Sequence, residues 1–232
     1  MKVPVASAIT EVFRSLGDFL FPPACILCGG ECPGDRKICP SCENRLTERA
    51  FDYSPPPRAI KSIDRIFVLL PYDDECRTLV HAFKYHGMPS AARMAGRLMG
   101  RKTAGVIGEF RDAILVPVPL HPDRLFERGY NQSALLAEGF ASFAGNRIRD
   151  DIIARTVRTP TQTALSAEER ARNVSGAFRY TGDMSLGGMP VIIVDDVMTT
   201  GSTISECARA LKSGGAGPVA VCVVATPDAG MD

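Results

Sequence analysis

From about residue 61 onward, apolar residues fall into two alternating patterns. Short continuous apolar runs, typical of strands buried on both faces, alternate with segments whose apolar positions recur every three or four residues, typical of helices. The predicted strands are 66–70, 113–118, 152–153, 191–194 and 219–224. The predicted helices cover 76–83, 136–143 and 204–211. This alternation predicts an α/β fold over 61–232, with a mainly parallel sheet flanked by helices.

The first sixty residues follow a different pattern. Residues 1–20 carry apolar side chains at helical spacing, which predicts an amphipathic helix that lies on the body of the protein. A place on a membrane surface is the alternative, but the polar face of this helix carries acids as well as bases. Residues 21–50 are rich in cysteine, glycine, proline and charge, and predict a small finger. Residues 51–60 contain three consecutive prolines, so we expect a linker there.

The composition narrows the class of protein. Among 232 residues, 27 Lys and Arg nearly balance 26 Asp and Glu, and the net charge of +1 provides no general basic surface for nucleic acid or membrane. Because no apolar run approaches the ~18 residues that a membrane span needs, we expect none. Charged residues interrupt any export signal near the start of the sequence. We therefore expect a cytoplasmic protein in a reducing compartment, where clustered cysteines are more often metal ligands than disulfides.

Five of the eight cysteines fall between Cys25 and Cys42. Two Cys-x-x-Cys pairs, Cys25 with Cys28 and Cys39 with Cys42, offer four thiolates from two tight turns, which is a set that tetrahedral Zn²⁺ prefers. Four thiolates leave no open coordination position, so this zinc would be structural. Cys32 lies between the pairs and could replace a ligand, although we take it as a bystander. Cysteines that are reduced or disulfide-bonded without metal are the alternative.

The strongest chemical pattern follows the apolar run 191–194. Asp195 and Asp196 end the predicted strand, and we place the start of the next helix at a Thr203–Glu206 capping box. The free N–H groups of a helix N-terminus suit phosphate, and hydroxyls add further donors. The carboxylates instead suit sugar hydroxyls, or a Mg²⁺ shared with the ligand. Together these groups describe a site for ribose 5-phosphate. Its expected phosphate loop consists of Thr199, Thr200, Gly201, Ser202 and Thr203.

This segment resembles the 13-residue phosphoribosyl pyrophosphate (PRPP) motif of type I phosphoribosyltransferases, with both acids and the Thr-Thr-Gly-Ser-Thr loop intact. Other motifs resemble the ComF family, also called the competence protein F or GntX-like group. The resemblance covers nearly the whole chain from about Phe21. The motifs that carry it are the cysteine pairs, Phe83-Lys-Tyr-His-Gly87, Val116-Pro-Val-Pro-Leu-His-Pro122, Glu127-Arg-Gly-Tyr-Asn-Gln132 and the stretch from Arg155 to Phe178.

The resemblance implies a type I phosphoribosyltransferase-like fold that carries a zinc finger and binds PRPP with Mg²⁺. It implies that Asp195 and Asp196 hold the ribose hydroxyls and that the loop at 199–203 holds the 5-phosphate. The loop 118–124 would hold pyrophosphate, and a basic loop over 155–172 would close over the substrate. A dense anion needs cations. The basic candidates are Lys84, Arg124, Arg128, Arg155, Arg158, Arg170 and Arg172.

Three functions remain open at this stage. The first is a phosphoribosyltransferase that passes the phosphoribosyl group to an unknown acceptor. The second is a cytoplasmic adaptor that binds single-stranded DNA during DNA uptake, alongside a competence helicase and recombination proteins. The third is a regulator built on the same fold without catalysis. Tyr130 and Asn131 either contribute to the site or hold their turn structurally.

Overall fold

The computed structural model describes residues 24–32, 36–49, 62–105, 107–157 and 176–227, and the backbone of 52–54. The chain forms two compact units, Met1–Glu48 and Arg49–Asp232. The amphipathic helix expected at 1–20 lies outside the described residues. In the described part of the chain, no helix is both long enough and apolar enough to span a membrane.

A five-stranded sheet forms the centre of the larger unit, in the order β1-β2-β7-β6-β3. The last four strands in this order are mutually parallel, and β1 joins β2 as an antiparallel edge strand. The strands β6 and β7 are buried on both faces, which explains why their sequences are continuously apolar. The strands are β1 (Asp52–Ser54), β2 (Arg65–Val68), β3 (Ile114–Pro117), β6 (Val191–Val197) and β7 (Val219–Ala225).

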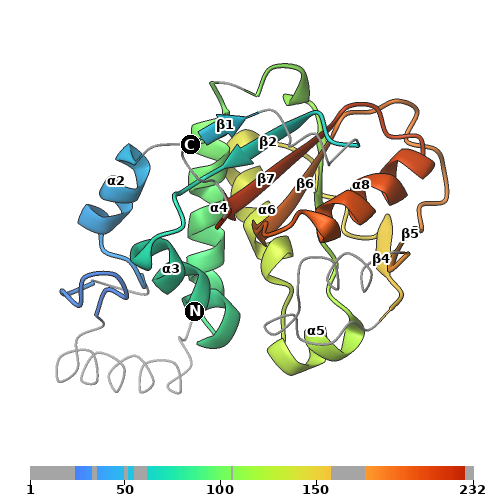
Figure 1. Ribbon diagram of the computed structural model, residues 1–232. Coiled ribbons are helices and arrows are strands. Elements are labelled where there is room, and N and C mark those ends of the chain that lie inside the picture. The colour runs from blue at the N-terminus through green and yellow to red at the C-terminus, as the bar shows by residue number, and fades with distance from the viewer. Residues whose placement is uncertain are drawn as a thin grey trace, which may run out of the picture. The chain divides into compact units, whose positions relative to one another are not determined.

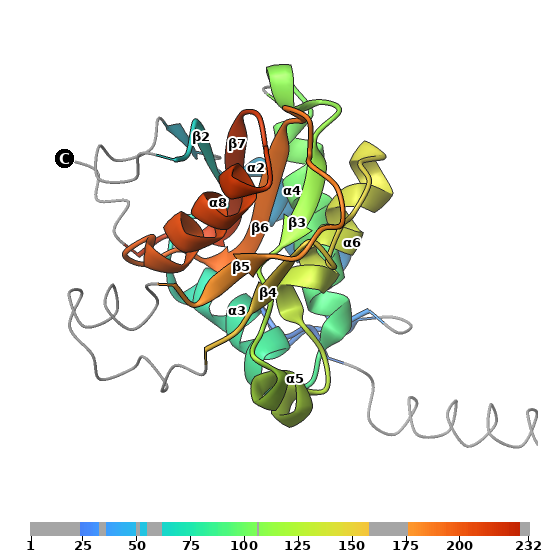
Figure 2. The same ribbon diagram turned by 90° about the vertical axis from the view of Figure 1, so that its right-hand side faces the viewer.

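Helices cover the two faces of this sheet (Figure 1). Figure 2 shows α8 on one side of the sheet and α4 and α6 on the other. Alternate residues of the strands, among them Val191 and Ile193, pack with Ile204 and Leu211 of α8. The long helices are α3 (Asp74–Tyr85), α4 (Pro89–Thr103), α6 (Gln132–Ala144) and α8 (Ser202–Ser213).

The remaining elements lie outside the main sheet. The predicted strand at 152–153 is β4 (Ile153–Arg155), which pairs with β5 (Phe178–Tyr180) in a separate two-stranded antiparallel sheet that packs against α8. A short helix, α5 (Pro122–Arg128), follows β3, and a 3₁₀ turn spans Gly108–Phe110. The main sheet is therefore parallel except at the β1 edge.

The linker expected at 51–60 needs a correction at its first residues. Asp52, Tyr53 and Ser54 pair with β2 and form part of the sheet. The reason is positional, because the three prolines come after these residues and do not interrupt their pairing. Arg49 also belongs to the larger unit, since its guanidinium pairs with Asp73 and, at 2.9 Å, with Glu75 at the start of α3.

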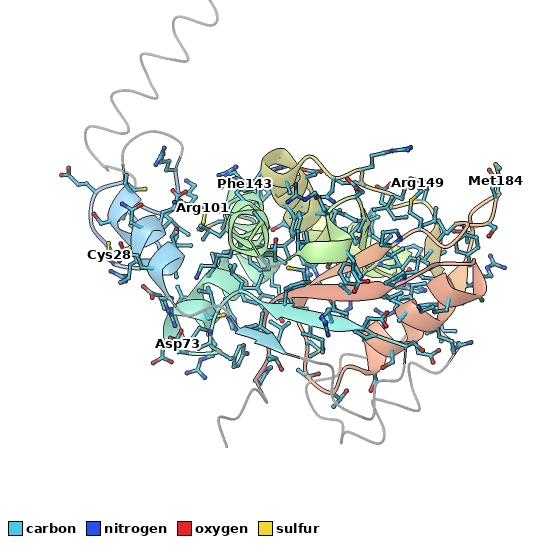
Figure 3. The ribbon with its side chains drawn as sticks, turned by 90° about the horizontal axis from the view of Figure 1, so that it is seen from above. Cys28, Asp73, Arg101, Phe143, Arg149 and Met184 are labelled. Atoms are coloured by element: carbon cyan, nitrogen blue, oxygen red, sulfur yellow. The ribbon has the colours of Figure 1, made fainter. Side chains whose placement is uncertain are left out.

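The helices α4 and α6 cross at backbone contact distance because glycines stand at the crossing. A Cβ atom at Gly96 would lie 2.0 Å from the carbonyl oxygen of Leu136, and one at Gly139 would lie 2.1 Å from that of Arg93. By contrast, Phe143 lies on the side of α6 that faces away from the sheet (Figure 3) and is 52 % exposed. The glycines thus set how closely α6 approaches α4.

We expect Gly139→Ala to destabilise the protein by about 2–3 kcal/mol, because the added methyl group overlaps backbone atoms that cannot move aside. The loss should exceed the roughly 1 kcal/mol that alanine gains over glycine in a helix. Chemical denaturation would measure the change. Gly105→Ala is the matched control, since a Cβ there meets no atom within 4 Å. Equal stability of the two variants would contradict the close crossing.

Candidate metal and phosphate sites

The four paired cysteines converge in the smaller unit. Their Sγ atoms all lie within 4.8 Å of one another, and those of Cys28 and Cys39 are 3.8 Å apart. Regular tetrahedral ZnS₄ with Zn–S bonds of 2.3 Å has S–S edges of ~3.8 Å. One pair lies in a turn with Gly29 at a φ of 71°, and the other flanks the start of α2 (Pro40–Glu48). The residues therefore fit a structural zinc ion.

The environment acts in opposite directions on two of the four thiols, because burial and the neighbouring cysteines raise the pKa of Cys42 whereas the pKa of Cys25 is lowered. Burial raises the pKa of Cys25, but hydrogen bonds from the backbone N–H groups of Cys39, Leu27 and Cys28 outweigh it and lower this pKa to about 6. Arg45 donates to Sγ of Cys42 at 3.3 Å. Such donors stabilise negative charge on sulfur, which a bound dication would complete.

Cys32 is buried beside the cluster but is absent from the converging set. Burial raises the pKa of its thiol, and the negative charges of Cys25 and Cys39 act in the same direction. A neutral thiol in an apolar setting is a packing residue. This position agrees with its interpretation as a bystander.

The two adjacent acids lie at the carboxyl end of β6 and have different partners. Oδ1 of Asp196 lies 2.7 Å from Nζ of Lys84, at the end of α3, and its Oδ2 accepts from Nε2 of Gln132 at 2.9 Å. Oδ1 of Asp195 accepts from Oγ of Ser133 at 2.8 Å and from the N–H of Asp196 at 2.9 Å. The acids are thus held from α3 and from the first turn of α6.

Proximity of the two carboxylates changes their acidity. Burial and repulsion from Asp196 raise the pKa of Asp195 to about 7, although Lys84 and Ser133 oppose the rise. Burial alone would lower the pKa of Lys84, but attraction to Asp196 outweighs it and raises this pKa. Lys84 is therefore charged at neutral pH, while Asp195 titrates near it.

The loop after the acids leads into α8 through Gly201, whose φ of 73° requires a residue without Cβ strain. Oγ1 of Thr200 and Oγ of Ser202 are 2.9 Å apart. The expected Thr203–Glu206 capping box is wrong, because the helix begins at Ser202 and Gly201 is its N-cap. Glu206 instead accepts from the N–H of Gly176 at 2.6 Å and pairs with Arg209.

The segment after β3 carries several of the basic candidates. The last three residues of the loop expected at 118–124 are helical, since α5 begins at Pro122 with His121 as its N-cap. Arg124 pairs with Glu127 at 3.0 Å, and Arg128 donates to Oε1 of Gln132. The structure thus places Arg128 beside the partners of the acidic pair.

Tyr130 and Asn131 hold the turn that follows α5. The hydroxyl of Tyr130 donates to the carbonyl of Phe83 at 2.6 Å. Nδ2 of Asn131 donates to the carbonyl of Val118 at 3.0 Å, and its Oδ1 caps α6. These contacts agree with the interpretation that Tyr130 and Asn131 hold their turn structurally.

Arg155 lies on β4, with its guanidinium 5.5 Å from the ring centre of Phe178. Burial lowers its pKa, and the negative charge of Asp195 acts in the opposite direction, so the guanidinium is within electrostatic reach of the acidic pair. The rest of the basic loop expected to close over the substrate, with Arg158, Arg170 and Arg172, lies outside the described residues.

Sequence reasoning missed Gln132 and Ser133. Both are buried at the start of α6 and bind the acids from more than 60 positions away in the chain. A signal for Gln132 was present in the sequence, since this residue ends the motif Glu127–Gln132 that carries part of the family resemblance. A buried polar side chain needs a partner, but the sequence does not name which one.

Comparisons with known proteins agree with this architecture. A profile of the phosphoribosyl transferase domain matches residues 143–231, and one of the double zinc ribbon domain matches residues 16–52. The DNA utilization protein YhgH of Escherichia coli K12 is 32% identical over 208 residues, which cover 85% of this chain and 87% of the relative. Competence protein F of Haemophilus influenzae is 30% identical over 198 residues, which cover 80% and 84%.

This chain belongs to the ComF family. Competence protein ComFC of Bacillus subtilis, 24% identical over 201 residues, covers 78% of the chain and extends the same similarity. The phosphoribosyl transferase match includes β6, both acids and the loop into α8. The zinc ribbon match includes the four converging cysteines. The ComF fold expected from the motifs is thus confirmed in both of its units.

We expect the purified protein to carry a single zinc ion per chain and to lose it in Cys42→Ser, because three thiolates cannot complete the tetrahedron. Cys32→Ser is the matched control, with a buried cysteine outside the converging set. Elemental analysis after gel filtration would measure the stoichiometry. Loss of zinc from Cys32→Ser would instead make Cys32 a ligand.

Proposed function

We propose that this protein binds PRPP or another ribose 5-phosphate ligand at the carboxyl end of β6. The observation that carries the proposal is the placement of the acids Asp195 and Asp196 at the end of β6, with five residues between Asp196 and a glycine-capped helix start at Ser202. Ligands of open parallel sheets bind beyond the carboxyl ends of the strands. The helix start suits the 5-phosphate, and carboxylate oxygens suit the hydroxyls of the ribose ring.

The acidic pair is a poor site for a divalent cation held by the protein alone. The ammonium of Lys84 already lies 2.7 Å from Asp196 and supplies a countercharge. Mg²⁺ prefers several oxygen ligands and is commonly bound through one or two carboxylates plus substrate phosphates. We propose that Mg²⁺ arrives with the pyrophosphate group of PRPP, where it neutralises charge on the leaving group.

Catalysis, if the acceptor is present, would rest on positioning and on charge stabilisation at the leaving pyrophosphate. The C1–O bond to pyrophosphate breaks as an amine or base attacks C1, and the electron pair leaves with the pyrophosphate. Arg155 lies within electrostatic reach of the acids, and Arg128 lies beside Gln132. Among the residues that the structure describes, these two arginines are candidates for contact with the ligand's anionic groups.

We expect calorimetric titration to show PRPP binding in the presence of Mg²⁺ and a loss of at least about 10-fold in affinity for Ser202→Asp, which puts like charge beside the 5-phosphate. An acid in the first turn stabilises a helix, so unfolding of α8 would not explain this loss. Ser213→Asp, at the exposed other end of α8, is the matched control. No binding to the wild type, or equal binding to Asp195→Asn/Asp196→Asn, would refute the site.

A role in DNA uptake is the second candidate, and the names of the relatives favour it, since they are called competence or DNA utilization proteins. Under this proposal the same loop grips a phosphate of single-stranded DNA, as an adaptor for a helicase and recombination proteins. The net charge of +1 argues for a local contact and not for a broad basic surface.

Fluorescence anisotropy with a single-stranded oligonucleotide would test this second function. We expect affinity to fall steeply as salt rises, because phosphate contacts release counterions. If the loop at 199–203 takes the DNA phosphate, Ser202→Asp weakens DNA binding and PRPP displaces the oligonucleotide, whereas Ser213→Asp binds like the wild type. Binding that is insensitive to Ser202→Asp would place DNA elsewhere on the molecule.

A further inference from the structure

The two acids at the end of β6 are chemically unequal. Three donors reach Asp196: Lys84, Gln132 and the N–H of Val197, at 2.7, 2.9 and 2.6 Å. A carboxylate offers about four acceptor sites, so Asp196 is nearly saturated by the protein itself. It is also only 4% exposed. Asp196 is thus placed and neutralised before any ligand arrives.

Asp195 has a different arrangement. Both of its hydrogen bonds, from Ser133 and from the N–H of Asp196, end on Oδ1. Within the described part of the chain, no hydrogen bond ends on its Oδ2. Asp195 is half-buried as a residue, in contrast to the buried Asp196. Among the four carboxylate oxygens of the pair, Oδ2 of Asp195 therefore retains the most acceptor capacity for a ligand hydroxyl.

Lys84 decides how much charge the pair presents. Its side chain is largely buried, with 21% exposed, and its ammonium lies against Asp196. Two neighbouring carboxylates without this cation would repel each other in a low-dielectric setting. With it, the pair presents at most one negative charge, which belongs to Asp195 when that carboxyl group is ionised.

We propose that Lys84, Gln132 and Ser133 are positioning residues that make Asp196 an internal anchor and leave Oδ2 of Asp195 to take a ribose hydroxyl. The inference rests on the proposed ribose 5-phosphate site and divides its acidic pair into two roles. Lys84 acts through Asp196 and not by contact with the ligand's phosphates. Asp196 in turn orients Asp195 through its backbone N–H.

A double replacement distinguishes two models: one in which Asp196 is an internal anchor, and one in which both acids contact the ligand. In Asp196→Asn, the ammonium of Lys84 loses its partner and pairs with Asp195, which covers the oxygen that the ligand needs. Adding Lys84→Met removes that competing cation. We therefore expect Lys84→Met/Asp196→Asn to bind ribose 5-phosphate about 10-fold more tightly than Asp196→Asn alone. Lys212→Met, which removes a distant exposed lysine of α8, should give no such rescue.

Calorimetric titration with ribose 5-phosphate in EDTA is the measurement, because this ligand carries no pyrophosphate and needs no metal. A double variant that binds as weakly as Asp196→Asn would overturn the division, since Asp196 would then contact the ligand itself. A wild type that binds ribose 5-phosphate in EDTA no more than background would overturn the division, and one that also fails to bind PRPP with Mg²⁺ would overturn the proposed function. Thermal unfolding of each variant, with Lys84→Arg as the conservative replacement, identifies any loss of affinity that comes from loss of folding.

The pH dependence of affinity provides a readout that a structural role would not move. A hydroxyl donates well only to the ionised form of Asp195, so affinity should fall as pH drops through about 7. Ser133→Ala removes a hydrogen bond to that ionised form and should move the midpoint to higher pH. The ligand's phosphate titrates identically with both proteins. An unchanged midpoint in Ser133→Ala would overturn the role of Ser133.

The groups that face Asp195 from the surrounding elements define this titration. Asp196 on the same strand raises its pKa, whereas Lys84 of α3 and Ser133 of α6 lower it. Arg155 of β4 and Cys207 of α8 also lie within electrostatic reach. Because burial raises the pKa of Cys207 well above its usual range, this thiol stays neutral through the measured interval.

Discussion

The burial of β6 on both faces is the constraint on which the rest of this structure depends. A strand covered by α8 on one side and by α6 on the other is apolar from Val191 to Val194, and its first charged side chains are Asp195 and Asp196, close to the end of its pairing with β7. Polar groups can therefore gather only at its carboxyl end, where β3 also ends in register beside it. The acids, the loop into α8 and the start of α6 meet there because the parallel topology brings these chain segments together.

Much of this arrangement could be predicted from sequence, because the signals were local. The continuous apolar runs located β3, β6 and β7, and the Cys-x-x-Cys spacing located the metal cluster. The adjacent acids and the glycine before α8 also stand in one short segment. A short sequence motif was therefore sufficient to predict a site wherever a single segment of the chain supplied its chemical groups.

Other features were not predictable, for physical reasons that differ from case to case. The helix α4 was not predicted, because the close crossing with α6 places small residues such as Gly96 and Gly100 on its buried face, where large apolar side chains would otherwise mark a helix. The partners of the acids could not be named, because Gln132 is 64 positions from Asp196 in the chain. The capping box failed because Glu206 found a tertiary partner at Gly176. In each case packing between distant segments determined the outcome.

The glycine crossing of α4 and α6 links the helix scaffold to the acidity of the site. Because Gln132 and Ser133 occupy the first turn of α6, the position that this helix takes against α4 also affects how far their donors are from the carboxylates. Hydrogen bonds of this kind lose strength over a few tenths of an ångström. Gly96 and Gly139, which lie away from the proposed ligand, thus influence the pKa of Asp195 through the first turn of α6.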